Sequence, residues 1–241
     1  MRQPVTVSGR PLRVFLVLVT LTFSVGAVPS YASSDVGPMA LYGPEILFDV
    51  SRNGEHVGQH TVFFEQTADG LNVDAHMTID IKFLGFKAYS YDYRSTSLWR
   101  DGRLVRLDSK IDDDGDISRV EVRSEGDRLV VTAADGARAE TAPIYPTDHW
   151  NAGVLGASKV INTITGRIDQ VEIEPLGESD VDFNGASTAA RHYQYTGDLS
   201  TEVWYDRDGR WVKMRFKAQD GSTIEYTCRN CAAEHAAAAL Q

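Results

Sequence analysis

The sequence predicts an all-β protein whose strands form one large antiparallel sheet, strongly curved or rolled into a partly open barrel. From Leu71 to Phe83, apolar and polar residues alternate without a break, which is the two-residue period of a strand. Asn-Gly and Asp-Gly pairs recur along the chain, and these residues accept the positive φ angles that tight hairpin turns require. A sheet of this many strands must curl, split or close.

The strands are expected between these turn pairs, and most neighbours should be antiparallel because their connections are short. The turn pairs are Asn53-Gly54, Asp69-Gly70, Asp101-Gly102, Asp114-Gly115, Asp135-Gly136, Asn184-Gly185, Asp208-Gly209 and Asp220-Gly221. We predict strands near residues 45–51, 57–66, 71–83, 87–100, 103–111, 117–124, 128–133, 159–164, 168–174, 179–184, 188–196, 200–206, 210–219 and 222–228.

One segment, residues 147–158, breaks this rhythm. Thr147 or Asp148 could cap a short helix here. Gly153 and Gly156 would keep that helix short or irregular, because glycine disfavours a helix interior. We therefore expect one short helical or irregular element in an otherwise all-β chain.

The first 32 residues have the pattern of a secretory signal peptide. Three arginines precede an apolar run that starts at Val14, and small residues at Ser30 and Ala32 form a cleavage pattern. A membrane anchor is the alternative, but polar residues interrupt the run and it is short for a bilayer span. We expect a periplasmic or secreted protein with one β domain over residues 33–231 and an alanine-rich tail over residues 232–241.

Composition and charge exclude two classes of protein. Hydrophobic residues make up 42% and charged residues 24% of the chain, which is typical of a packed core and not of disorder. Removing the signal peptide takes away three arginines and no acidic residue, so the net charge changes from −10 to −13. A phosphate-binding face needs a basic surplus, so we expect no nucleic-acid partner.

Two motifs could bind metal or carry redox chemistry, and both have simpler explanations. Cys228 and Cys231 are the only cysteines, and in an oxidising compartment such a pair is usually a disulfide. The acidic run 112–116 has the first spacings of a calcium loop, but Gly115 is misplaced for its turn. Arg123 also stands where a closing glutamate is needed, so we expect a hairpin turn. The prediction is therefore no metal and no cofactor.

Candidate functional residues gather in the segment 145–151. The chain has no nucleophile elbow, zinc-binding helix or phosphate loop, and the histidines do not cluster in sequence. This loop is expected to sit on a rigid sheet, where functional residues often lie. It carries Tyr145, Asp148, His149, Trp150 and Asn151. The alternative is that Trp150 packs as core at one end of the sheet and that Thr147 or Asp148 only caps a helix.

The strand after Leu84 has two faces, and its register decides which one lines the concave side. A two-residue turn, Leu84-Gly85, would place Asp92 and Arg94 beside Met77 and Ile79. A three-residue turn, Leu84-Gly85-Phe86, would place Tyr89, Tyr91 and Tyr93 on the face of Ile79 and Ile81 instead. A buried ionic pair needs hydrogen bonds that apolar neighbours cannot supply, whereas tyrosine can bury its ring and leave its hydroxyl at a wet rim. We predict the three-residue turn and the tyrosine face.

Several stretches together resemble a family of bacterial exported proteins described only as a domain of unknown function. They are Phe48-Asp49-Val50-Ser51-Arg52-Asn53-Gly54 with Val57-Gly58, Pro146-Thr147-Asp148-His149-Trp150-Asn151, Asn162-Thr163-Ile164-Thr165-Gly166, Val203-Trp204-Tyr205-Asp206 and Asp220-Gly221-Ser222. The resemblance implies a periplasmic β-protein similar in shape to the half-barrels that carry lipoproteins between membranes. It implies no activity and no catalytic residues.

The sequence supports two main hypotheses for function. The first is a non-catalytic envelope protein, peripheral to a membrane at most, that binds an apolar or amphipathic molecule or a partner on its concave face. Its ligand-binding residues would be Tyr89, Tyr91, Tyr93, Tyr145, His149 and Trp150. The second is a periplasmic hydrolase with a site around Asp148 and His149. A groove with few titratable groups favours the first, and a cleft with converging acid and base favours the second.

Overall fold

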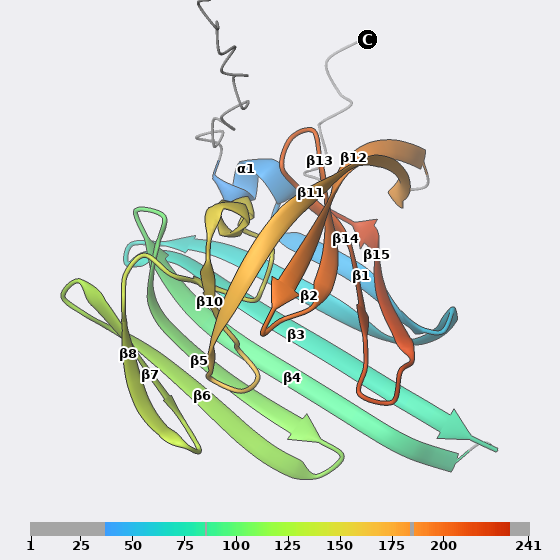
Figure 1. Cartoon of the computed structure of the whole chain (residues 1–241), viewed down its shortest axis with the longest axis horizontal. Helices are drawn as coiled ribbons and strands as arrows, with labels where there is room; N and C mark the ends of the chain where they lie inside the picture. Colours follow the sequence, from blue (N-terminus) through green and yellow to red (C-terminus); the bar gives the residue numbers. More distant parts are fainter. Residues whose placement is uncertain (1–36, 85, 184–185, 232–241) are drawn as a thin grey trace, which may run out of the picture. The chain divides into compact units, whose positions relative to one another are not determined.

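Fifteen strands form one continuous sheet in the computed structural model, which describes residues 37–84, 86–183 and 186–231 (Figure 1). The elements are α1 (Pro38–Tyr42), β1 (Glu45–Arg52), β2 (Glu55–Thr67), β3 (Gly70–Phe83), β4 (Phe86–Arg100), β5 (Arg103–Asp113), β6 (Asp116–Glu125), β7 (Arg128–Ala133), β8 (Gly136–Thr141), β9 (Tyr145–Pro146), η1 (Ala152–Gly156), β10 (Lys159–Ile161), β11 (Ile168–Phe183), β12 (Ala186–Gly197), β13 (Thr201–Asp206), β14 (Trp211–Lys217) and β15 (Thr223–Asn230). The predicted signal peptide and alanine-rich tail lie outside the described residues, so both stay predictions.

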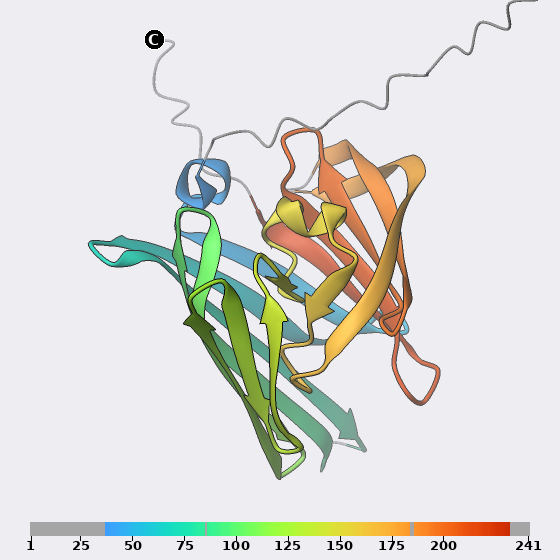
Figure 2. The ribbon, with the colours of Figure 1, turned by 60° about the vertical axis from the view of Figure 1, so that its left-hand side comes forward.

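The strand order runs β8-β7-β6-β5-β4-β3-β2-β1-β15-β14-β13-β12-β11-β10-β9, and the sheet is curved without closing. All neighbouring strands are antiparallel except β9 and β10, which are parallel. Figure 2 shows the curvature: the strands β1–β8 and the strands β10–β15 face one another, with η1 between them. The predicted all-β fold, a curved sheet or partly open barrel with one short helical segment near 147–158, is confirmed.

The gap between the two ends of the sheet is bridged by side chains and by one loop. Lys159 Nζ of β10 lies 3.2 Å from Glu140 Oε2 of β8. The loop between β10 and β11 packs against β5, where Ser109 Oγ donates to the carbonyl oxygen of Thr163 at 2.6 Å. Gly166 in this loop has a φ of +71°, and a Cβ there would lie 2.6 Å from the side chain of Ala133. The loop thus approaches β7 at a distance that only glycine permits.

The hairpin turns follow the predicted chemistry. Asn53-Gly54, Asp101-Gly102 and Asp114-Gly115 have positive φ at both central residues, the conformation that matches the twist of paired strands. The acidic run forms one of these turns, because Asp113 pairs with Asp116 and Asp112 Oδ1 accepts a hydrogen bond from the Gly115 amide at 2.8 Å. The expected hairpin turn is therefore confirmed.

Five features of the secondary structure differ from the prediction, and one of them is the unpredicted strand β9 (Tyr145–Pro146). The helix α1 and the strand β8 were not predicted, and the two expected strands 168–174 and 179–184 are one strand, β11. A register shift between Pro175 and Gly177 lets β11 continue past its proline. The helical element η1 is capped by Asn151, whose side chain accepts from the Gly153 amide at 2.9 Å. The predicted caps, Thr147 or Asp148, are wrong because the chain turns at His149, three residues before η1 begins, with φ +54°.

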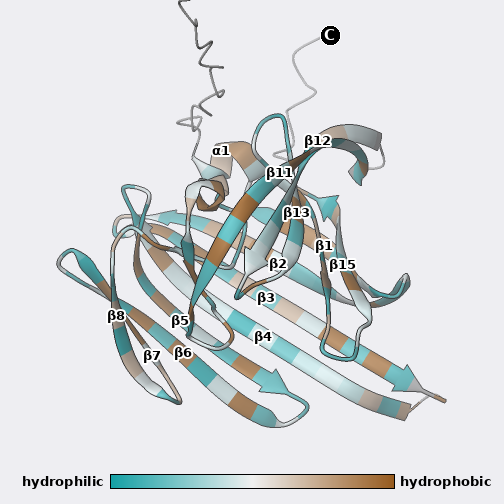
Figure 3. Cartoon of the chain, in the orientation of Figure 1, coloured by the Kyte–Doolittle hydropathy of each residue, from teal (hydrophilic) through white to brown (hydrophobic). Residues whose placement is uncertain are grey.

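The pairing of β3 with β4 places the tyrosines on the predicted face, although a bulge sets the register and not the length of the turn. Met77, Ile79 and Ile81 pair with Tyr93, Tyr91 and Tyr89. The three-residue turn is wrong, because Phe83 pairs with Phe86 and the register shifts by one residue after Ile81. This bulge supplies the extra residue that the turn was expected to supply. Figure 3 shows the resulting alternation as brown and teal bands along the strands.

Cys228 in β15 and Cys231 are joined by a disulfide. Within residues 37–231 as described, the helices are too short or too polar to cross a bilayer.

Candidate functional site

The segment 147–151 enters the space between the two halves of the sheet and is held there by tyrosine hydroxyls. Tyr205 of β13 donates to the carbonyl oxygen of His149 at 2.8 Å. Tyr42 of α1 donates to the carbonyl oxygen of Trp150 at 2.9 Å and accepts from the Trp211 amide at 2.9 Å. These bonds satisfy buried backbone groups that have no strand partner. Sequence elements far apart therefore fix the backbone of the candidate loop.

Trp150 is a core residue. Its side chain is 4% exposed and packs edge-to-face against Phe64 and Trp99, with ring centroids 5.4 Å and 5.1 Å away. Its Nε1 donates to Asp148 Oδ2 at 2.9 Å. The structure thus places Trp150 where it closes the interior, as in the structural alternative. Tyr145 of β9 lies beside η1, where its hydroxyl would be 2.5 Å from a Cβ at Gly153, and not beside the tyrosines of β4.

Two buried histidines pack against Trp211. The rings of His60 and His149 both lie with centroids 5.7 Å from Trp211. Burial lowers the pKa of His60 to about 3 and the pKa of His149 to about 4, so both are neutral at neutral pH. Among the residues that the structure describes, the buried Nδ1 atoms of both rings have no hydrogen-bond partner. The same holds for the hydroxyl of Tyr195, whose ring lies 5.5 Å from His149.

Asp148 is the acidic group of this interior. Burial raises the pKa of Asp148 to about 7, although part of the residue stays exposed to solvent. The charge of Asp148 in turn raises the pKa of Tyr195 and of Tyr205, after the larger effect of burial. A carboxyl with this pKa can both donate and accept a proton near neutrality. Its bond goes to Trp150, so the sequence pair Asp148-His149 does not form a carboxylate–imidazole dyad in the described residues.

A second group of predicted residues lines the open part of the sheet. Tyr93, Tyr91 and Tyr89 follow one another along the inner face of β4. Tyr93 is 6% exposed, whereas Tyr91 and Tyr89 are half-buried. Burial raises the pKa of Tyr93 to about 12, and the pKa values of Tyr89 and Tyr91 are raised further by the same cause. We call Tyr89, Tyr91 and Tyr93 the tyrosine strip.

The tyrosine strip borders a cleft of about 270 Å³. Its lining residues are Tyr91, Ile111, Asp113, Asp116, Ser118, Arg119, Ala133, Ala134, Ile164 and Thr165. Burial raises the pKa of Tyr226 of β15, and the nearby Tyr91 and Tyr93 raise it further. Of its lining residues, Ile111 is buried at 2% exposure, whereas the charged Asp113, Asp116 and Arg119 are exposed. This arrangement suits a molecule with one apolar and one polar end.

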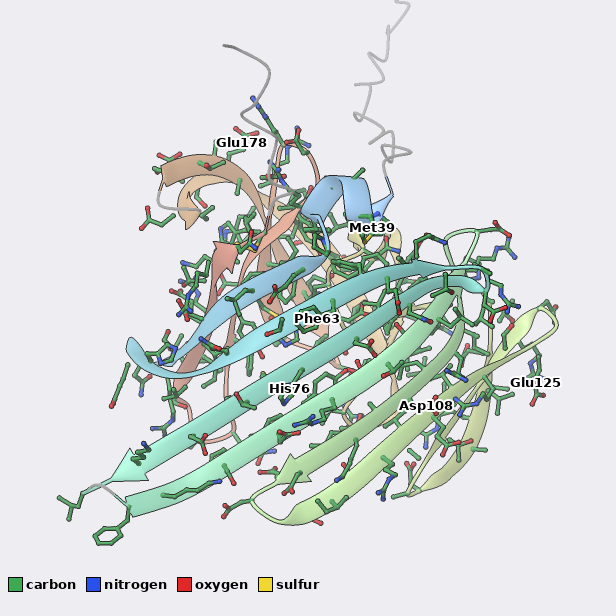
Figure 4. The ribbon with its side chains drawn as sticks, turned by 180° about the vertical axis from the view of Figure 1, so that it is seen from behind. Met39, Phe63, His76, Asp108, Glu125 and Glu178 are labelled. Atoms are coloured by element: carbon green, nitrogen blue, oxygen red, sulfur yellow. A yellow bond between two sulfur atoms is a disulfide. The ribbon has the colours of Figure 1, made fainter. Side chains whose placement is uncertain are left out.

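The outer face of the same strands carries ion pairs. Arg94 Nε donates to Asp92 Oδ1 at 2.8 Å, and His76 Nε2 lies 3.1 Å from Asp92 Oδ2. Figure 4 shows this side, with His76, Asp108 and Phe63 pointing away from the interior. Asp92 and Arg94 therefore face solvent, as the register argument predicts.

Sequence reasoning missed the part that His60, Tyr42 and Tyr195 play in the interior. A lone histidine in a strand is usually just a polar side chain, yet Val62 and Phe64 follow His60 at two-residue spacing and are buried. That alternation places His60 on the inner face and could have identified it. The convergence of His60 with His149 depends on long-range packing, for which the sequence carries no local signal.

Comparisons with known proteins agree with this fold. The family described as "Domain of unknown function (DUF6134)" matches residues 48–229. A crystal structure of a beta-barrel-like protein of the domain of unknown function DUF1849 from Brucella abortus is similar, with a TM-score of 0.55 and 13% identity over 76% of this chain and 94% of that one. No curated protein sequence matches. The family match spans β1 to β15 and therefore the whole sheet, so this chain belongs to the DUF6134 family.

Proposed function

We propose that this protein is a non-catalytic, exported envelope protein that binds an amphipathic molecule on its concave face, at the tyrosine strip. One observation supports this above others: Tyr89 and Tyr91 lie on the inner face of the sheet and are only half-buried. Aromatic side chains that turn inward and yet keep exposed surface provide a ready contact for an apolar group. The beta-barrel-like fold of the similar structure is compatible with a binding role.

The polar end of the ligand would lie at the rim of the cleft. Ser118 and Arg119 offer hydrogen-bond donors there, beside the carboxylates of Asp113 and Asp116. At about 270 Å³ the cleft is slightly smaller than the ~300–1,000 Å³ typical of sites that enclose a drug-sized molecule. The ligand would therefore extend from the cleft along the tyrosine strip instead of being enclosed.

A fluorescence titration tests this proposal. The purified protein is titrated with the amphipathic fluorophore 8-anilino-1-naphthalenesulfonate, and copurifying molecules are identified by mass spectrometry. We expect Tyr91→Ser to weaken probe binding about tenfold, since it removes one aromatic contact of roughly 1–2 kcal/mol. Phe63→Ser is the matched control, because Phe63 is an exposed aromatic residue on the outer face of β2. Equal loss in both variants, or no loss in Tyr91→Ser, would refute binding at the strip.

The second candidate, a hydrolase centred on Asp148 and His149, is favoured by the raised pKa of Asp148. The described residues supply neither side chain with a hydrogen-bonded hydroxyl or thiol nucleophile, which makes this the weaker proposal. His149→Ala separates the two. A hydrolase would lose activity against ester substrates, whereas the binding protein keeps its affinity for the probe. Trp150→Ala should unfold the protein in either case, with a loss of about 3–5 kcal/mol.

A further inference from the structure

We infer that the tip of the β3–β4 hairpin is a docking element for an anionic lipid bilayer. This inference extends the proposed function by giving the amphipathic ligand a source, and the docking itself does not depend on that function.

The hairpin projects beyond both of its neighbouring strands. Pairing of β3 with β2 ends at Ile79, and pairing of β4 with β5 ends at Tyr91. Apart from the bond between Ser90 and the β5–β6 turn, residues 80–84 and 86–90 therefore form a two-stranded extension, visible at the lower right of Figure 1. An isolated hairpin gains little stability in water, so an extension of this length is expected to have a binding role.

The tip of this extension is apolar and exposed. Leu84 is 81% exposed and Phe86 is 78% exposed, the two highest values among the exposed large hydrophobic residues. Both lie at the end of the extension, beyond the paired parts of β2 and β5. Exposed aromatic and aliphatic side chains at such a point insert into the boundary between lipid headgroups and acyl chains.

The charges beside the tip favour an anionic bilayer as the occupant. Lys82 and Lys87 flank the apolar residues and are exposed, and Lys87 Nζ lies 3.3 Å from Asp80 Oδ1. The extension therefore carries one net positive charge, in a chain whose net charge is −10. Lysine beside an apolar anchor pairs with lipid phosphates while its stem stays in the interface.

The acidic turn between β5 and β6 lies beside β4, farther from the tip than Lys82 and Lys87. The amide of Asp114 donates to the carbonyl oxygen of Ser90 at 2.8 Å, which places this turn four residues along β4 from Phe86. At a rise of about 3.3 Å per residue, the tip projects roughly 13 Å past the acidic turn. That separation exceeds the Debye length at physiological ionic strength, so the carboxylates would not prevent the tip from reaching an anionic surface.

The inner face of the extension continues into the proposed ligand site. Ile81 and Tyr89 pair at its base, followed by Ile79 with Tyr91 and Met77 with Tyr93. An apolar path of cross-strand pairs thus leads from the tip to the buried interior.

Vesicle sedimentation tests the docking. We expect the purified protein to sediment with phosphatidylglycerol vesicles and to bind phosphatidylcholine vesicles about tenfold more weakly. Leu84→Ser with Phe86→Ser should reduce binding at least about tenfold, and Lys82→Ser with Lys87→Ser should abolish the preference for phosphatidylglycerol. Ile117→Ser is the matched control, because Ile117 is 42% exposed on a different hairpin.

Three outcomes would overturn the inference: no sedimentation of the unmodified protein, equal loss in the Ile117 control, or a change of oligomeric state in place of vesicle binding when the tip is altered. Phe86→Trp gives a second readout that preserves an aromatic tip, and its fluorescence should shift to the blue with phosphatidylglycerol vesicles. Tyr91→Ser separates the two proposals, since it should lose probe binding and keep vesicle binding.

Discussion

Replacing Asp148 with asparagine should make the protein more stable at alkaline pH and leave it nearly unchanged in acid. The asparagine side chain would keep an oxygen to accept the bond from Trp150 Nε1 and would remove the group that ionises. The surrounding protein raises the pKa of Asp148 from 3.8 to about 7. Between these values the folded protein holds a proton that the unfolded chain has lost. Raising the pH through about 7 therefore destabilises the fold.

The magnitude follows from the two pKa values. At about 1.4 kcal/mol per pH unit, ionisation of Asp148 destabilises the native state by about 4 kcal/mol once the pH exceeds 7. Between pH 5 and pH 8, we expect the stability of Asp148→Asn relative to the unmodified protein to rise by about 3 kcal/mol. The buried histidines titrate in both proteins, so their effects cancel in this difference.

The assay is urea unfolding followed by tryptophan fluorescence at both pH values, with the disulfide intact. Asp92→Asn is the control, and its stability relative to the unmodified protein should be nearly the same at pH 5 and pH 8, because both values lie above the folded and the ordinary pKa of Asp92. The hydrogen bond from Arg94 lowers the pKa of Asp92 to about 2, so Asp92 stabilises the native state above its ordinary pKa of 3.8, and that stability is lost as the pH falls through about 2. If the difference between Asp148→Asn and the unmodified protein is the same at pH 5 and pH 8, the proposed burial of Asp148 is wrong.

Three further predictions concern packing and export. Tyr42→Phe should lower the free energy of unfolding in urea by about 3 kcal/mol, because the Trp150 carbonyl and the Trp211 amide both lose their partner. Tyr91→Phe is the control and should change this free energy little. Gly58→Ala should destabilise by about 3 kcal/mol, since its Cβ would lie 1.8 Å from the Thr78 carbonyl oxygen, whereas Gly156→Ala has free space and should be neutral in thermal unfolding. N-terminal sequencing of the exported protein should begin at Ser33, and a product that retains Met1 would contradict the signal peptide.

The sequence was most informative where local chemistry decides the structure. Alternation along 71–83 and the positive-φ pairs at Asn53-Gly54 and Asp114-Gly115 determine strands and turns through neighbours only. β8 was not predicted because the apolar positions of its two-residue alternation, Ala137 and Ala139, are too weakly hydrophobic to give a clear strand pattern. β11 continues past Pro175 because pairing with β12 absorbs the irregularity, which only the partner strand reveals.

The candidate site was predictable only in part, for the same reason. The tyrosine face of β4 follows from what can be buried, so the sequence indicates it even though the turn length was wrong. The role of His149 depends on Trp211, Tyr195 and Tyr205, which lie on β14, β12 and β13. These contacts arise from the curvature of the sheet, which brings its two halves together across more than fifty residues of sequence.

The pairing of β1 with β15 has a consequence for how the chain folds. It is the one neighbour pair of the described strands that is not consecutive in sequence, and Asp49 meets Arg229 across 180 positions. The remaining pairs form successive hairpins or short local connections that can assemble quickly. The pairing of β1 with β15 is therefore the slow step, because closing this long loop costs the most chain entropy. Until it forms, β1 presents an open edge to other chains. Joining the ends of β1 and β15 and opening the chain between β8 and β9 would yield a sheet whose strands all follow one another in order. Such a circular permutant should reach its native state faster than the natural connectivity.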